Sequence, residues 1–317
     1  MRWQCLRSVI IVTIAFISHA DCALHEMGLG HPECPARLTA IEDQLLSSGL
    51  NVALRRYDAP LATHEQLCRV HDPAYVEEIF SKAPKKGRVW LDPDTTMNPH
   101  TLAAVLRAAG AVVLGVDLVM SGRRQSAFCN VRPPGHHAGR KGSMGFCIFN
   151  NIAVGAAHAL HEYRLKRVAI VDFDVHHGNG TEDIFQDNAD VLYCSTFQHP
   201  FYPDTGADVE SEHIVTVPLP VGTEGPQFRA AVASRWLPKL EAFKPELILV
   251  SAGFDAHIED DMAGLRLREP DFAWVTTKIR EIAEKHASGR IVSVLEGGYA
   301  LSALGRSVAA HLDALLG

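Results

Sequence analysis

The chain has 317 residues, of which 47% are hydrophobic and 21% are charged, and its formal charge is −7. The acidic balance argues against a general nucleic-acid or anionic-membrane surface, so we expect neither among its partners. The length suits one large α/β domain or two small ones. Seven cysteines without a CxxC pair favour reduced thiols in a cytosol over a disulfide framework.

The first apolar stretch, residues 9–17, allows two interpretations. Arg2 and Arg7 precede it, and Ser18-His19-Ala20 after it could serve as the cleavage site of a secretory signal peptide that directs export. Alternatively, residues 13–17 form the first strand of the core, and cleavage would then remove part of the fold. We prefer the strand and therefore expect a cytoplasmic protein, with export as the alternative.

Short β-rich segments then alternate with longer segments of helical periodicity along the rest of the chain. Such alternation is typical of βαβ units, so we predict an α/β fold: a single three-layer αβα domain with a mostly parallel central sheet. This domain is expected to span 1–317, with residues 1–10 as an extension outside the core. The predicted strands are 12–17, 126–130, 167–172, 190–196, 214–217, 246–251 and 290–295, and the predicted helices are 36–48, 64–70, 73–81, 101–120, 150–163, 226–242, 270–286 and 301–315.

Polar, glycine-flanked segments follow four of the predicted strands. Ligands of open parallel sheets bind outside the carboxyl ends of the strands, so these segments are expected to converge on one site. The four segments are 132–139, which contains His136 and His137; 172–180; 252–257, which contains Asp255; and 296–299, which ends in Tyr299.

The segment 172–180 carries the strongest chemical signal, because Asp172, Asp174 and His176 occupy alternate positions. Alternating residues of an extended chain point the same way, so these three side chains can share one face. Two carboxylates and an imidazole would form a metal site that keeps one coordination position open. A polar surface turn is the alternative interpretation of this segment taken alone.

Taken together and in order, the motifs of the chain resemble those of the histone deacetylase superfamily, which includes bacterial histone deacetylase-like amidohydrolases and acetylpolyamine amidohydrolases. The resemblance begins near Ile14, covers nearly the whole chain, and implies an arginase/deacetylase-like fold. It also supports the strand interpretation of residues 13–17. The motifs are Gly30-His-Pro-Glu33, Arg132-Pro-Pro-Gly-His-His137, Gly145-Phe-Cys147, Asp172 to Gly180, Ala252-Gly-Phe-Asp255 and Leu295-Glu-Gly-Gly-Tyr299.

The resemblance implies that Asp174, His176 and Asp255 are the ligands of one zinc ion per chain. Such an oxygen-rich site is less selective for zinc than a thiolate site, so it also suits Fe(II) or Co(II). Similar proteins bind K⁺ as a structural cation as well. The corresponding positions here are Ser195 with the backbone of 172–176 for one site, and Phe185 for part of another.

The resemblance also implies catalytic roles. His137 would be the general base and later the acid that protonates the leaving amine, with His136 as its electrostatic partner. Asp172 is expected behind His136, and Asn179 behind His137, to fix the tautomers of the two imidazoles. Asn179 departs from the class I-like members, which carry an aspartate there, and agrees with class II-like ones. Tyr299 would donate its hydroxyl to the oxyanion.

In similar enzymes, a narrow tube with two aromatic walls and an apolar residue near the metal holds the substrate. The resemblance places Phe146 and Tyr202 in the walls and Met262 near the metal. Tyr202 replaces the usual phenylalanine and adds a polar edge, while Met262 stands where some polyamine-selective members have an acidic residue. An apolar tube suits the four-carbon stem of an acyl-lysine. Further substrate contacts are expected at Gly145, Gly297 and His31.

We therefore predict a zinc-dependent deacetylase that hydrolyses N-acetyl-lysine in peptides or proteins and releases acetate. One alternative is an amidohydrolase for acetylpolyamines or another small amide, and an alternative of another class is a non-catalytic acyl-ligand binding regulator. A dimanganese ureohydrolase is disfavoured, because Gly178 stands where a carboxylate would have to bridge a second metal. The expected partner is an acetylated peptide, protein or small amine, and a homo-oligomer is compatible with the sequence.

Overall fold

An eight-stranded parallel sheet forms the middle of the molecule. The structure, a computed structural model, describes residues 13–209 and 211–317, so the expected extension at 1–10 lies outside it. Neighbouring strands of the sheet are parallel throughout, in the order β2-β1-β5-β10-β9-β6-β7-β8. The sheet contains β1 (Ile14–Ser18), β2 (Leu54–Asp58), β5 (Ser126–Cys129), β6 (Val168–Asp172), β7 (Val191–Gln198), β8 (Ile214–Leu219), β9 (Leu247–Ala252) and β10 (Ile291–Leu295).

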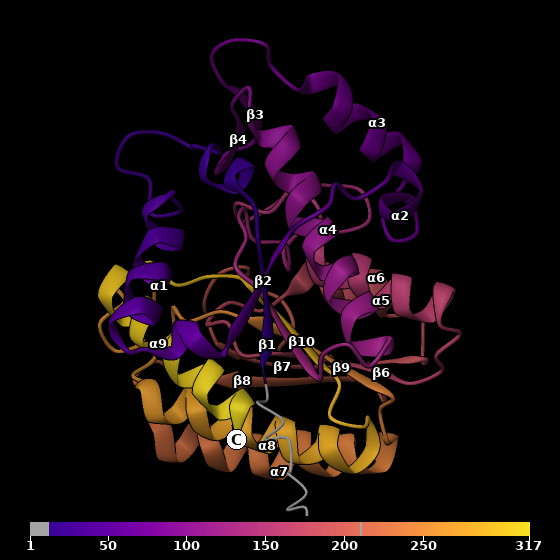
Figure 1. Cartoon of the computed structure of the whole chain (residues 1–317), viewed down its shortest axis with the longest axis vertical. Coiled ribbons are helices and arrows are strands. Elements are labelled where there is room, and N and C mark those ends of the chain that lie inside the picture. Colours follow the sequence, from indigo (N-terminus) through magenta and orange to yellow (C-terminus); the bar gives the residue numbers. More distant parts are fainter. Residues whose placement is uncertain (1–12, 210) are drawn as a thin grey trace, which may run out of the picture.

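Helices cover both faces of this sheet, so the predicted three-layer α/β domain is confirmed (Figure 1). One face carries α4, α5 and α6, and the other carries α7, α8 and α9, with α1 packed against α9. A short antiparallel pair, β3 (Val89–Asp92) and β4 (Thr95–Met97), lies apart from the sheet. The helices are α1 (Ala36–Ser47), α2 (His64–Cys68), α3 (Pro73–Lys82), α4 (Thr101–Met120), α5 (Asn151–Glu162), α6 (Asn179–Phe185), α7 (Gly225–Phe243), α8 (Glu269–His286) and α9 (Leu301–Leu316), with 3₁₀ turns at Ala20–Ala23 and Leu50–Ala53.

The inner strands of the sheet consist mainly of buried apolar residues. Every residue of β5, β6, β9 and β10 is buried, as expected for parallel strands that have helices on both sides. Strand β1 lies between β2 and β5, and its first four residues are buried. The predicted strand at 12–17 is therefore confirmed for residues 14–17, while residue 12 lies outside the described residues.

Three strands and one helix lie where the sequence predicts none. β2 is an edge strand of mostly polar, partly exposed residues, so it lacks the apolar run that marks the inner strands. β3 and β4 have only four and three residues. The seven-residue α6 begins between Gly178 and Gly180, a composition that indicates a break in regular structure.

The four strands that precede the polar segments are neighbours in the sheet. They stand in the order β5-β10-β9-β6, and all four run in the same direction. Their carboxyl ends therefore meet at one edge. The expected convergence of the four segments is confirmed.

One helix of the interior, α4, is apolar enough that its composition alone would also allow it to span a membrane. Within the described residues, α4 is the one helix long and apolar enough to cross a membrane, yet 67% of its 18-residue window is buried inside the domain. It packs on β1, β5 and β10 and is therefore a core helix.

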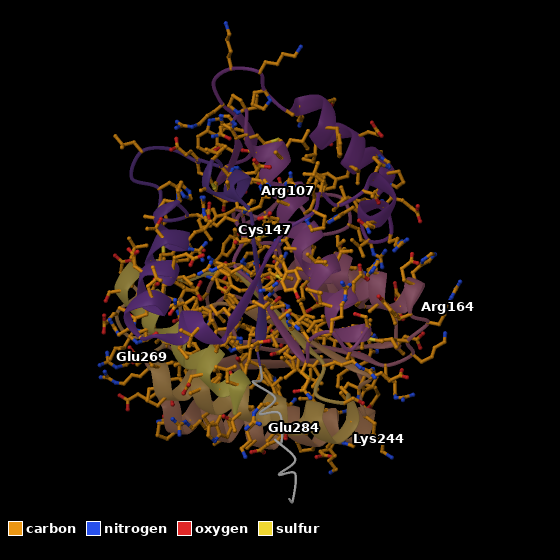
Figure 2. The ribbon with its side chains drawn as sticks, in the orientation of Figure 1. Arg107, Cys147, Arg164, Lys244, Glu269 and Glu284 are labelled. Atoms are coloured by element: carbon orange, nitrogen blue, oxygen red, sulfur yellow. The ribbon has the colours of Figure 1, made fainter. Side chains whose placement is uncertain are left out.

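Figure 2 shows Cys147 within the fold, whereas Arg164 and Lys244 lie at the periphery. Cys147 is fully buried and free, as expected for a small core residue.

A buried ionic network ties the N-terminal loop to the loops after β5 and β10. Glu33 accepts hydrogen bonds from two nitrogens of Arg132, one of them at 2.5 Å, and lies 3.2 Å from Nη1 of Arg37. Arg37 in turn donates to the carbonyl oxygens of Glu296 and Gly298. All three charged side chains of the network are fully buried. Burial alone would raise the pKa of Glu33, but Arg132, His25 and Arg37 outweigh it and lower that pKa to about 2.

We expect Glu33→Gln to reduce the free energy of unfolding by about 3–5 kcal/mol at pH 7, because it leaves buried guanidinium groups without a counter-charge. The pKa of Glu33 is lower in the folded chain than the ordinary value of 4.5. The stabilisation is therefore complete above pH 4.5 and is lost as the pH falls toward 2. Urea unfolding at pH 7 and at pH 3 measures the free energy of unfolding of the variant and of the unmodified protein. The difference between the two should be smaller at pH 3.

The exposed ion pair of Glu42 and Arg56, with Nη2 and Oε2 2.7 Å apart, provides the control. Glu42→Gln should cost less than about 1 kcal/mol, since exposed ion pairs contribute little. Equal losses from the two variants would show that the buried network does not stabilise the fold.

Candidate active site and metal centre

Three side chains from the ends of β6 and β9 form a candidate metal centre. Ligand atoms of Asp174, His176 and Asp255 all lie within 4.8 Å of one another, and all three residues are buried. Nδ1 of His176 is 3.1 Å from Oδ1 of Asp174 and 3.3 Å from Oδ2 of Asp255. The structure thus brings together the three residues that the sequence predicts as metal ligands.

The chemistry of this trio suits a divalent cation. Oδ1 of Asp255 accepts a hydrogen bond from the backbone of Val175, but Oδ2 is buried and has no hydrogen-bond partner among the described residues. Burial and the adjacent Asp174 carboxylate raise the pKa of Asp255 to about 6. Since a buried carboxylate needs a compensating charge or hydrogen bond, this oxygen is available to a metal ion. Two carboxylates and one imidazole also match the ligand types of catalytic zinc sites.

Two glycines allow the carboxylates to approach the backbone. A Cβ atom on Gly297 would lie 2.0 Å from Oδ2 of Asp255, and a Cβ atom on Gly253 would lie 2.0 Å from Oδ2 of Asp174. The close approach also allows the Gly297 backbone N–H to donate a hydrogen bond to Oδ2 of Asp174 at 2.8 Å. Any side chain at either glycine would displace a metal-ligand candidate.

Asp172 does not join the metal trio, so the face expected from strand alternation is wrong in this respect. The extended conformation of β6 ends at Asp172, and the residues after it form a bend rather than a strand. Oδ2 of Asp172 lies 3.0 Å from Nδ1 of His136 and accepts a second hydrogen bond from the Tyr193 hydroxyl at 3.0 Å. Asp172 therefore stands behind His136, as the family resemblance implies.

The two histidines of the loop after β5 have opposite electrostatic surroundings. Burial alone would lower the pKa of His136, but Asp172 and Asp174 raise it to about 10. Burial and the positive charges of His136 and His176 lower the pKa of His137 well below its usual value. Nδ1 of His137 lies 2.7 Å from Oδ1 of Asn179, so the amide oxygen fixes the ring with its proton on Nδ1. Nε2 of His137 is then free to accept a proton.

Tyr299 reaches the same site from the turn after β10. Its ring stacks edge-on against Phe146, with centroids 6.1 Å apart, and the Arg37 guanidinium lies 4.9 Å from its centroid. Removal from water raises the pKa of the phenol well above its usual value. The hydroxyl therefore stays protonated and can donate a hydrogen bond.

A cavity of about 220 Å³ opens above these groups. His137, His176 and Tyr299 line it, and so do five of the six predicted substrate contacts: Gly145, Phe146, Tyr202, Met262 and Gly297. His31, the sixth, lies outside the lining and packs edge-on against Phe146, with ring centroids 4.7 Å apart. The cavity thus has the predicted aromatic walls, with His31 supporting one of them.

Comparison with known proteins identifies the family of the chain. A family model described as the histone deacetylase domain matches residues 31–315. The chain belongs to the histone deacetylase family. Its fold agrees with the crystal structure of the HDA15 HD domain, with a TM-score of 0.89 and 32% sequence identity over 96% of this chain and 90% of that one.

Several curated relatives of the family carry names that describe an activity. The histone deacetylase-like amidohydrolase of Pseudomonas aeruginosa is 38% identical over 277 residues, which cover 85% of this chain and 73% of the relative. The polyamine deacetylase HDAC10 of Mus musculus is 37% identical over 330 residues, covering 96% of this chain and 48% of the relative. The chain thus spans about half the length of the second relative.

Several residues at this histone deacetylase site were not singled out from the sequence. Phe201, Asp94 and Pro134 also line the cavity. Phe201 stands beside Tyr202 in an aromatic pair that could have indicated it, whereas Asp94 lies in a segment without an obvious motif. Tyr193 is likewise hidden in an apolar strand, although its hydroxyl holds Asp172.

The predicted potassium sites, the homo-oligomer and the cytoplasmic location stay predictions. At the first potassium position, Oγ of Ser195 lies 3.2 Å from Nδ1 of His177.

Proposed function

We propose that the protein is a zinc-dependent deacetylase that hydrolyses N-acetyl-lysine in peptides or proteins and releases acetate. The observation that carries the proposal is the convergence of Asp174, His176 and Asp255, whose buried Oδ2 has no hydrogen-bond partner among the described residues, beside a cavity lined by His137, His176 and Tyr299. Bound by this trio, Zn²⁺ would polarise the acetyl carbonyl and lower the pKa of a water molecule.

The protein's own residues would carry the proton transfers. His137 is neutral, with Nε2 free, so it can remove a proton from the attacking water and later return it to the leaving amine. His136, held by Asp172, contributes positive charge beside it. The Tyr299 hydroxyl would hydrogen-bond to the oxygen that develops negative charge.

The walls of the cavity favour a lysine side chain as the substrate stem. Phe146, Phe201 and Tyr202 present aromatic surface, which suits a flexible four-carbon chain. Met262 adds an apolar contact where some polyamine-selective relatives carry an acidic residue, although Asp94 also lines the cavity and places one carboxylate there. Acetylpolyamines are the second candidate substrates, because a relative is named as a polyamine deacetylase.

The test is turnover of an acetyl-lysine peptide, N-acetylputrescine and N-acetylspermidine by the zinc-reconstituted protein. We expect the peptide to be hydrolysed with the highest kcat/KM, because its aliphatic stem fits the apolar walls. Faster turnover of the two polyamines would assign the protein to small acetylated amines. Tight peptide binding without acetate release would instead support a non-catalytic acyl-ligand binding regulator.

A further inference from the structure

Tyr299 sits at the end of a turn that cannot fix its position unaided. Gly297 and Gly298 precede it, and Gly298 has φ +120°, a conformation that only glycine adopts readily. Two consecutive glycines leave the local backbone permissive, so the direction of the phenol must be set by contacts with other segments. Arg37 supplies one such contact, because its Nε donates to the Gly298 carbonyl at 2.6 Å.

The second contact comes from Asp260, on the loop between β9 and α8. Its Oδ2 atom accepts the backbone N–H of Tyr299 at 2.6 Å and that of Ala300 at 2.9 Å. Its Oδ1 atom accepts the backbone N–H of Met262 at 3.1 Å. Asp260 is only 5% exposed, although its side chain neither lines the cavity nor belongs to the metal trio.

We propose that Asp260 is a positioning residue that sets the Tyr299 phenol and the Met262 side chain in one fixed relation. One carboxylate holds the backbone of both residues, and both line the cavity. Asp260 also supplies the carboxylate at the N-terminus of α9, where Ala300 has no capping side chain of its own. A purely structural cap would stabilise α9 without affecting the reacting groups, so the test has to separate these two roles.

Asp260→Ala is compared with Asp261→Ala, each with and without Tyr299→Phe. Asp261 is the neighbouring residue on the same loop, is exposed, and makes no hydrogen bond with the part of the chain that the structure describes, so it controls for loss of charge. The kinetic part rests on the proposed deacetylase function. We expect Asp260→Ala to lower kcat about 10- to 100-fold, a part of the 10²–10³ attributable to an oxyanion donor, with little change in KM. In the Tyr299→Phe background, the same substitution should change kcat less than about twofold.

A second readout needs neither metal nor activity. The chain has six tyrosines, so a protein labelled with ¹³C at the tyrosine ring carbon that bears the hydroxyl gives few signals, and Tyr299→Phe identifies the Tyr299 signal. We expect this signal to shift or broaden in Asp260→Ala and to stay unchanged in Asp261→Ala. An unmoved Tyr299 signal, or equal kinetic losses in both backgrounds, would overturn the proposal.

Asp260→Asn is the milder variant if the alanine substitution prevents folding. Its carbonyl oxygen can still accept from Tyr299 and Ala300, but its amide group would face the Met262 N–H as a second donor. We expect a loss of about 3- to 10-fold in kcat that again disappears in the Tyr299→Phe background. If the unmodified protein hydrolyses no acetylated amine, the proposed deacetylase function is wrong, but the role of Asp260 is still open to test. The ¹³C signal of Tyr299 reports whether Asp260 positions the ring without any turnover.

Discussion

Asp255→Asn should leave the protein folded but without its metal and without measurable hydrolysis. Asparagine retains an oxygen that can accept the Val175 N–H, the 2.9 Å hydrogen bond made by Oδ1 of Asp255. It removes the charge from Oδ2, the buried oxygen that has no hydrogen-bond partner among the residues described. A metal centre of this type lowers the barrier by several kcal/mol, so we expect a loss of at least about 10³-fold in kcat/KM.

The measurement is zinc content by mass spectrometry after dialysis, together with turnover of the acetyl-lysine peptide. The unmodified protein should hold one zinc ion per chain, and Asp255→Asn should hold far less. Asp261→Asn removes an exposed carboxylate from the same loop and should change neither quantity. A variant at Asp255 that retained both zinc and turnover would rule out the trio as the catalytic metal centre.

Tyr299→Phe should lower kcat by about 10²–10³-fold while KM changes little, since the hydroxyl would act on the oxyanion rather than on the bound ground state. The aromatic ring remains in place without its hydroxyl, so its packing against Phe146 and Arg37 is retained. Zinc content should also be unchanged, because Tyr299 is not a member of the metal trio.

Tyr202→Phe is the matched control, because it removes another phenol hydroxyl from the same cavity. Ring packing of Tyr202 against His137, at 5.4 Å between centroids, would be preserved. We expect kcat to change by no more than a few-fold, which full progress curves at saturating peptide would measure. Equal losses in the two variants would mean that Tyr299 has no special role as an oxyanion donor.

Sequence reasoning was most successful where chemistry follows a buried strand. The segments with His137, Asp174, Asp255 and Tyr299 each follow an apolar run, and parallel strands bring their carboxyl ends to one edge. Strand periodicity failed one residue beyond β6, because Asp172 ends the extended backbone and the alternation of side chains ends with it. Family resemblance, rather than geometry, gave that residue its correct neighbour.

The remaining features depend on contacts between distant segments, which local patterns do not contain. Tyr193 is 21 residues from Asp172 in the chain, and its hydroxyl is hidden in a strand of buried residues. Asp260 is 39 residues from Tyr299 and belongs to a loop rich in acidic residues. β2 escaped prediction for a different reason, since an edge strand with exposed arginines lacks an apolar pattern.

The carboxylate of Glu296 ties the loop after β5 to the buried interior of the domain. Its Oε2 atom accepts the backbone N–H of Gly135 at 2.7 Å and that of His136 at 3.2 Å, and its Oε1 atom accepts the Ser251 hydroxyl at 3.0 Å. Loops that carry catalytic groups commonly open by local unfolding at low free-energy cost. Here, opening this loop would remove hydrogen bonds from a carboxylate that is fully buried just beyond the carboxyl end of β10. The loop that carries His136 and His137 should therefore open only when the core unfolds. The free energy needed to open the site should then be close to the free energy of unfolding of the domain.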